Sequence, residues 1–128
     1  MRLLLDGHAF LWWVLDDPRL SAAARRILSD GANALYLSAA TAWEVIIKTQ
    51  IGRLRLPEVA SRYVRSRMSQ YGIESLPIQL SHVLQIETLP LHHRDPFDRI
   101  LIAQSQLEDL PILTADRQIA QYDVKVVW

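Results

Sequence analysis

The amino-acid sequence predicts a three-layer α/β fold, with helices on both faces of a mostly parallel five-stranded sheet. Short apolar runs alternate along the chain with longer segments of helical periodicity, which is the order of strands and crossover helices in such sheets. Half of the 128 residues are hydrophobic, which is enough for a core without disulfides or metals as supports. No repeat or linker divides the chain, so we expect a single domain over residues 1–128.

Two strands and four helices are expected in the first part of the chain. In order they are strand 2–5, helices 9–15 and 21–29, strand 35–37, a helix from Ser38 to about residue 51, and helix 58–70. Pro18 separates the first two helices, and Ser21 and Ser38 are good N-caps. Gly52 closes the third helix, and Pro57 stands where the fourth would begin.

Three strands and two helices are expected in the remainder. They are strand 73–76, helix 81–88, a helix from Pro96 to about residue 107, and strands 112–113 and 124–127. Proline is favoured at the first position of a helix because it donates no hydrogen bond there, and Asp95 precedes it as a good N-cap.

Composition excludes several classes of protein. The chain has no cysteine, which excludes a disulfide framework and thiolate chemistry. Its first apolar run reaches Asp6 after three leucines, too few for a signal peptide or a membrane span. We therefore expect a soluble cytoplasmic protein with no membrane partner.

Charge is unevenly distributed, although the formal net charge is zero. Residues 45–73 carry six basic side chains against one acidic side chain, whereas residues 74–128 carry four basic and eight acidic ones. A basic segment of this kind is typical of a phosphate-facing surface, and equally of a solvated helix face. Both interpretations stay open.

Acidic side chains follow the ends of predicted strands. Asp6 comes directly after the first strand, Asp116 lies just beyond the fourth, and Glu44 stands in the helix behind the second. Ligands of open parallel sheets bind outside the carboxyl ends of the strands, so these carboxylates tend to converge. Each also has a structural explanation, because Asp6 and Asp116 could cap helices and Glu44 could pair with Lys48.

A fourth acid comes from the segment 95–98. Helix capping explains Asp95, but it explains Asp98 less well, since Asp98 shares a helix face with Leu101 and Ile102 and should point inward. Clustered carboxylates repel one another, and hard divalent cations such as Mg²⁺ or Mn²⁺ stabilise them. A site with two such ions can activate water and stabilise the leaving oxygen of a phosphodiester.

Five stretches match a known family in the same order over essentially the whole chain. They are LLD at 4–6, SAATAWE at 38–44, Lys48 followed by GRL at 52–54, RDPFDR at 94–99, and LTAD at 113–116. In these stretches the sequence resembles the PIN-domain ribonucleases, in particular the VapC-like toxins of type II toxin–antitoxin systems.

The resemblance implies a five-stranded parallel sheet flanked by helices and a Mg²⁺-dependent endoribonuclease, with Mn²⁺ as an alternative ion. It implies an RNA substrate, a small antitoxin that inserts into the active-site groove, and a homodimer. Thr114 takes the hydroxyl position before the last acid and is expected to contact the substrate. The third motif departs from the family because it holds two aspartates, of which Asp98 aligns better and Asp95 could assist. The acidic quartet that binds Mg²⁺ corresponds to Asp6, Glu44, Asp98 and Asp116.

Other side chains were candidates for contacts with the substrate. Arg94 and Arg99 flank the third acidic motif and are expected to contact phosphate. The four tryptophans could stack bases, although at helical or strand spacing such residues more often form core or dimer contacts. The four histidines have no other ligand at metal-site spacing, so neither a zinc site nor a histidine base is favoured.

Three alternative functions fit the sequence less well. An aspartyl-phosphate phosphohydrolase would need a second aspartate two residues after Asp6, where His8 stands. A nicotinamide enzyme would need a glycine-rich turn after the first strand, which offers only Gly7. A catalytically degenerate PIN domain acting as a binding or assembly module stays open, although the intact acids argue against it.

Overall fold

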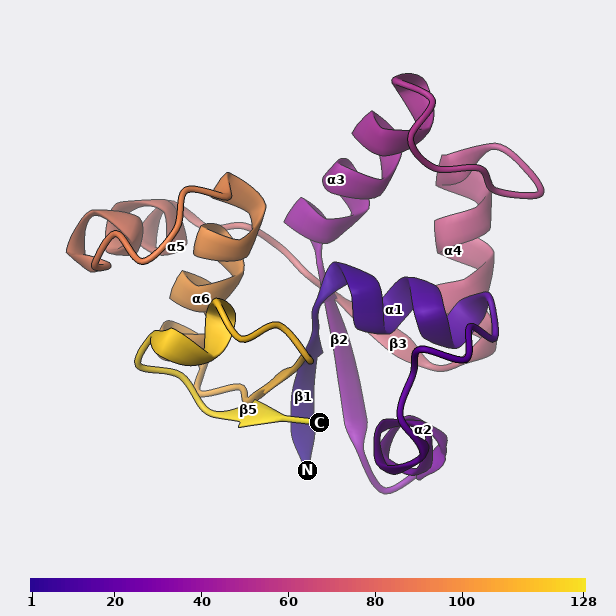
Figure 1. Cartoon of the computed structure of the whole chain (residues 1–128), viewed down its shortest axis with the longest axis horizontal. Helices are drawn as coiled ribbons and strands as arrows, with labels where there is room; N and C mark the ends of the chain where they lie inside the picture. The colour runs from indigo at the N-terminus through magenta and orange to yellow at the C-terminus, as the bar shows by residue number, and fades with distance from the viewer.

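The computed structural model describes all 128 residues and contains a five-stranded sheet with helices on both faces (Figure 1). The strands are β1 (Arg2–Leu5), β2 (Ala34–Ser38), β3 (Ile73–Leu76), β4 (Ile112–Leu113) and β5 (Val126–Val127). Their order across the sheet is β3-β2-β1-β4-β5, and every neighbouring pair is parallel. The predicted three-layer fold is therefore confirmed, with a sheet that is parallel throughout.

Six α-helices and two short 3₁₀ helices connect the strands. They are α1 (Gly7–Val14), α2 (Ala22–Ser29), α3 (Ala39–Gln50), α4 (Ala60–Gln70), α5 (Leu80–Gln85), η1 (Ile86–Thr88), α6 (Pro96–Glu108) and η2 (Ile119–Gln121). None of them combines the length and the apolar character that a membrane span requires.

Two predicted helices differ from those in the structure. The helix expected from Glu58 begins two residues later, at Ala60, with Val59 at the N-cap position and no side-chain cap. The helix expected over 81–88 is divided into α5 and η1, since its last turn tightens to 3₁₀ geometry.

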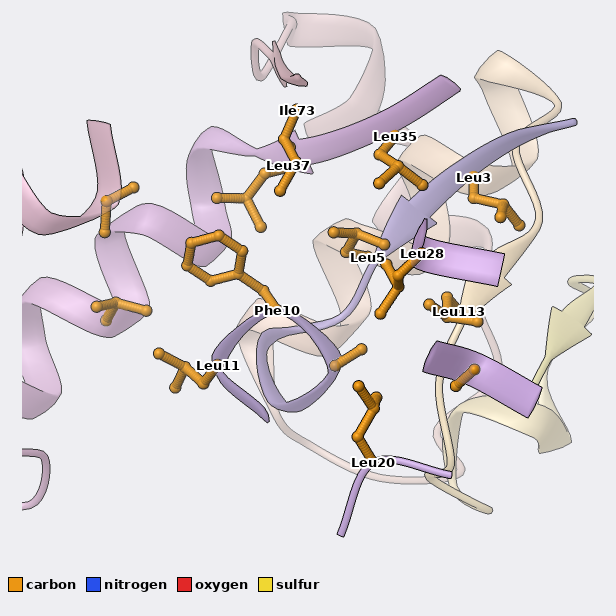
Figure 2. Packing of buried hydrophobic residues seen from close by; sticks show 14 residues of the cluster. Leu3, Leu5, Phe10, Leu11, Leu20, Leu28, Leu35, Leu37, Ile73 and Leu113 are labelled. Atoms are coloured by element: carbon orange, nitrogen blue, oxygen red, sulfur yellow. The ribbon is translucent and has the colours of Figure 1, made fainter. Parts of the chain in front are cut away.

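The central strand β1 is buried on both faces, which explains its uninterrupted run of leucines. Leu3 and Leu5 point into a cluster that includes Phe10 and is covered by α1 to α4, as Figure 2 shows. Leu4 points the other way, into a second cluster that includes Ile102 of α6. All three leucines are fully buried, and each contributes about 1.5–3 kcal/mol to stability.

The turns after β1 and β2 are short because one polar residue both ends the strand and caps the helix. Asp6 follows β1 and caps α1, while Ser38 ends β2 and caps α3. The carboxyl ends of the two strands therefore lie beside the first turns of α1 and α3.

Candidate active site

Asp6 is a buried carboxylate at the junction of β1 and α1. Its Oδ1 accepts a hydrogen bond from the backbone N–H of Ala9 at 2.6 Å, and its Oδ2 accepts one from the hydroxyl of Thr114. Burial raises the pKa of Asp6, and its effect exceeds that of the two hydrogen bonds, which lower it. Asp6 is therefore the N-cap of α1, which was one of its two roles expected from the sequence. Its buried carboxylate is also costly to ionise.

Thr114 connects the last acidic motif to the first. β4 lies beside β1 with Leu113 opposite Leu5, which places Thr114 next to Asp6. Its buried hydroxyl donates to Asp6 and accepts from the backbone N–H of Asp116 at 3.0 Å. Because its hydrogen bonds are made inside the protein, Thr114 positions two acids, and the contact with substrate expected for it stays a prediction.

Glu44 approaches the same place from α3. Its side chain is 16% exposed, and its Oε2 lies 3.4 Å from Nζ of Lys48 one turn further on. A Cβ on Gly7 would lie only 3.1 Å from Oε1 of Glu44, so the glycine leaves room for the carboxylate beside the first turn of α1. The ion pair with Lys48 considered from the sequence is present, and it lies inside the site.

Asp95 and Asp98 begin α6. Oδ1 of Asp95 accepts from the backbone N–H groups of Phe97 and Asp98 at 2.9 and 3.1 Å, which confirms it as the N-cap. Asp98 is directed inward, and its Oδ2 lies 3.0 Å from Nε2 of His93. Burial raises the pKa of Asp98 to about 6; the hydrogen bond from His93 opposes the rise, while Asp95 and Asp116 add repulsion.

All five acids line one cavity of about 150 Å³. Its walls carry five carboxyl groups and a single ammonium group, so the cavity has a large excess of negative charge. A larger cavity, of about 710 Å³, lies between the end of α6 and the segment before β5, but it lacks this excess. The lining residues are Asp6, Gly7, His8, Leu11, Glu44, Val45, Lys48, Asp95, Asp98, Asp116 and Gln118.

The donor set of this cavity fits a divalent cation with oxygen preference. Every charged acceptor is a carboxylate, and burial together with repulsion from neighbouring acids makes Asp6 and Asp98 costly to ionise without a cation. No three acidic or histidine side chains meet at direct ligation distance. Mg²⁺ does not require three such ligands, because it retains several of its waters and binds one or two carboxylates directly.

Comparison with known proteins places the chain in a family. The model of the PIN domain family matches residues 3–125. The chain belongs to the PIN domain family. The predicted resemblance is therefore confirmed, and the cavity lies in the part of this PIN domain that the match covers.

Among curated proteins, this PIN domain is similar to Ribonuclease VapC16 of Mycobacterium tuberculosis. The two sequences are 41% identical over 69 residues, which cover 51% of this chain and 49% of that protein. The chain thus spans about half the length of this curated relative in the match.

Several solved structures share the fold. The chain is similar to VapBC2 from Rickettsia felis bound to a DNA fragment of its promoter, with a TM-score of 0.73 and 10% identity over 100% of this chain and 98% of that one. FitAcB from Neisseria gonorrhoeae has a TM-score of 0.63 and 20% identity over 100% and 97%. VapBC-1 from Haemophilus influenzae has a TM-score of 0.62 and 15% identity over 94% and 91%.

The two arginines expected to contact phosphate lie in different environments. Arg94 is exposed in the loop before α6, beside Asp95. Arg99 is buried, and its Nη1 donates to the carbonyl oxygen of Pro90 at 2.8 Å and to the hydroxyl of Tyr122 at 2.9 Å. Its guanidinium is turned away from solvent, so Arg99 is corrected from a phosphate contact to a residue that holds the α6 region together.

Sequence reasoning missed three residues of the site. Gly7 makes room for Glu44, His8 lines the cavity, and His93 bonds to Asp98. Proximity to an acidic motif was the available signal, since Gly7 and His8 follow Asp6 directly. No local signal in the sequence marks His93, because its hydrogen bond to Asp98 depends on the conformation of the loop before α6.

Proposed function

We propose that this PIN domain is a Mg²⁺-dependent endoribonuclease and the toxin component of a VapBC-like toxin–antitoxin system. The observation that carries the proposal is the single cavity lined by five acidic residues from four separate parts of the chain. The similarity to a protein named as a ribonuclease supports an RNA substrate, and the VapBC complexes of the same fold support an antitoxin partner.

In this proposal Asp6, Glu44, Asp98 and Asp116 hold the cation, and Asp95 adds to the negative field. Bound there, Mg²⁺ would supply Lewis-acid polarisation of the phosphodiester and activation of water. Two hydrogen bonds hold Asp6 in one orientation, which limits the reorganisation needed when charge develops.

Basic side chains near the cavity would contact the RNA backbone. Lys48 lines the cavity, and Arg94 lies exposed beside its rim. Beyond Lys48, four exposed arginines continue over the loop after α3 and along α4, and none of them pairs with a carboxylate. We call this set, which consists of Arg53, Arg55, Arg62 and Arg65, the basic surface.

The proposed partners are a small antitoxin and a second copy of the chain. Exposed apolar side chains offer surface for such contacts, because large apolar residues left in solvent often mark protein–protein interfaces. Trp43 is 59% exposed, and Leu80, Leu84 and Leu91 are exposed as well.

The proposal is tested with purified protein freed of any partner and incubated with total RNA. We expect the wild-type protein to cleave RNA with Mg²⁺ but not with a chelator, and Asp6→Asn to be inactive under both conditions. Asp123→Asn is the matched control, because it removes an exposed acid outside the cavity and should keep full activity.

Equal cleavage by wild type and Asp6→Asn would contradict the proposal. Protein that binds Mg²⁺ or RNA without cutting it would favour the degenerate binding module instead.

A further inference from the structure

A chain of hydrogen bonds leads from the buried guanidinium of Arg99 to the carboxylate of Asp98. Arg99 Nη1 donates to the hydroxyl oxygen of Tyr122 at 2.9 Å. That oxygen lies 2.8 Å from Nδ1 of His93, and Nε2 of the same ring lies 3.0 Å from Oδ2 of Asp98. Arg99, Tyr122 and the His93 side chain are all less than a tenth exposed, so water competes little for these bonds.

The hydrogen-bond count at Tyr122 determines the tautomer of His93. The phenolic oxygen accepts two hydrogen bonds, one from Arg99 Nη1 and one from the backbone N–H of His93 at 3.2 Å. A hydroxyl has one proton to donate, and both acceptor positions of this one are taken. The proton therefore goes to Nδ1 at 2.8 Å, since the alternative acceptor, the His93 carbonyl oxygen, is 3.4 Å away.

The proton of the imidazole must then lie on Nε2, where it is donated to Asp98. All three bonds run in the same direction, from the cationic guanidinium through the hydroxyl and the imidazole to the carboxylate. Hydrogen bonds aligned in this way polarise one another and strengthen the last of them.

We propose that His93 is a positioning residue for Asp98, with its tautomer fixed by Tyr122 and Arg99. The Nε2–H group of His93 holds Oδ2 of Asp98, which leaves Oδ1 for the cavity that Asp98 lines. Supporting contacts of this kind fix the orientation of carboxylate ligands and commonly change metal affinity about 10–100-fold. The inference rests on the metal site of the proposed function.

The tautomer is tested by nitrogen-15 NMR of the His93 ring in metal-free wild-type protein at neutral pH. We expect a protonated Nε2 and an unprotonated Nδ1. Tyr122→Phe removes only the hydroxyl and should abolish this preference. A proton on Nδ1 of the wild-type protein, or an unchanged ring in Tyr122→Phe, would overturn the inference, whatever the protein does to RNA.

The effect on the site is tested by calorimetric titration with Mn²⁺ and Mg²⁺. We expect His93→Gln to bind at least about tenfold more weakly than wild type. His82→Gln is the matched control, because His82 is equally buried and bonds to Glu108 at 2.9 Å away from the cavity, so its affinity should stay unchanged.

Equal affinity of His93→Gln and wild type would refute the positioning role while leaving the proposed function intact. Absence of binding by the wild-type protein would refute the metal site, and the inference with it. If His93→Gln does not fold, the same titration on Tyr122→Phe decides, with a severalfold loss expected and an unchanged affinity contradicting the role.

Discussion

Gly7 is a residue whose missing side chain governs the distance between two acidic motifs. It occupies the first position of α1, where its backbone dihedrals are open to any residue. An added Cβ would stand 3.1 Å from Oε1 of Glu44 and 3.7 Å from a methyl group of Thr41. The second distance is an ordinary contact, whereas the first requires the carboxylate to move.

Gly7→Ala is expected to separate metal affinity from stability. Alanine is favoured over glycine in helices by up to about 1 kcal/mol, so the melting temperature should stay the same or rise. Displacement of Glu44 should weaken Mn²⁺ binding severalfold, as measured by calorimetry. Gly31→Ala is the control, since nothing lies within 4 Å of its added Cβ, and an equal loss in both variants would contradict the explanation.

The acids of the site could be predicted from the sequence because their positions depend on local pattern. Asp6 and Asp116 follow apolar runs that form strands, and the helical spacing around Glu44 sets the direction of its side chain. The role of Arg99 could not be predicted in this way. Its environment consists of carbonyl groups from the segment before α6 and the hydroxyl of Tyr122, which come together only in the folded chain.

At the level of elements, the first turn of α6 concentrates negative charge. Asp95 and Asp98 lie together there, and Asp116 approaches from the end of β4. The helix dipole favours acids at this end, but burial opposes the ionised form of Asp98 and raises its pKa to about 6. The folded state therefore binds a proton at Asp98 more tightly than the unfolded chain does.

Metal-free protein should accordingly become more stable as the pH falls from 7 to about 5. A carboxyl whose pKa is raised on folding lowers stability above that pKa, and protonation relieves this cost within the window between about 3.8 and 6. The raised pKa of Asp6 acts in the same direction. Thermal unfolding in a chelator measures the gain, and Asp98→Asn should show a smaller one; a loss of stability over this range would contradict the shift.

The order of helices and strands was also predictable, because apolar periodicity and caps are local signals. The start of α4 was not, since the helix begins at Ala60 after Val59, which has no side-chain cap, and not at Pro57, where proline is favoured. No proline or glycine marks the division between α5 and η1, so the sequence carries no local signal for it.

On the scale of the whole molecule, the acidic cavity and the basic surface lie on different elements. The acidic cavity lies at the carboxyl ends of β1 and β4, whereas the basic surface continues from the end of α3 along α4. Figure 1 shows where these strands and helices lie. Such a separation suits a nucleic acid whose backbone is held by arginines while one phosphodiester lies at the acids.

Replacement of Arg62 and Arg65 with Gln together should weaken RNA binding in a salt-dependent manner. Each lost phosphate contact lowers the slope of log K against log salt by about 0.7 for a single strand, so the pair should lower it by about 1.4. Binding is measured in the Asp6→Asn background, which keeps the RNA intact. Arg26→Gln, an exposed arginine of α2, should leave the slope unchanged, and equal slopes in all variants would exclude the basic surface from RNA binding.

The position of β4 beside β1 determines when, during synthesis, the acidic cavity can be completed. Asp6 and Glu44 emerge from the ribosome early, but Thr114 and Asp116 emerge only near the end of synthesis. A nascent or truncated chain that lacks β4 therefore lacks Asp116 and the support that Thr114 gives to Asp6. The acidic cavity cannot be complete until translation is nearly finished.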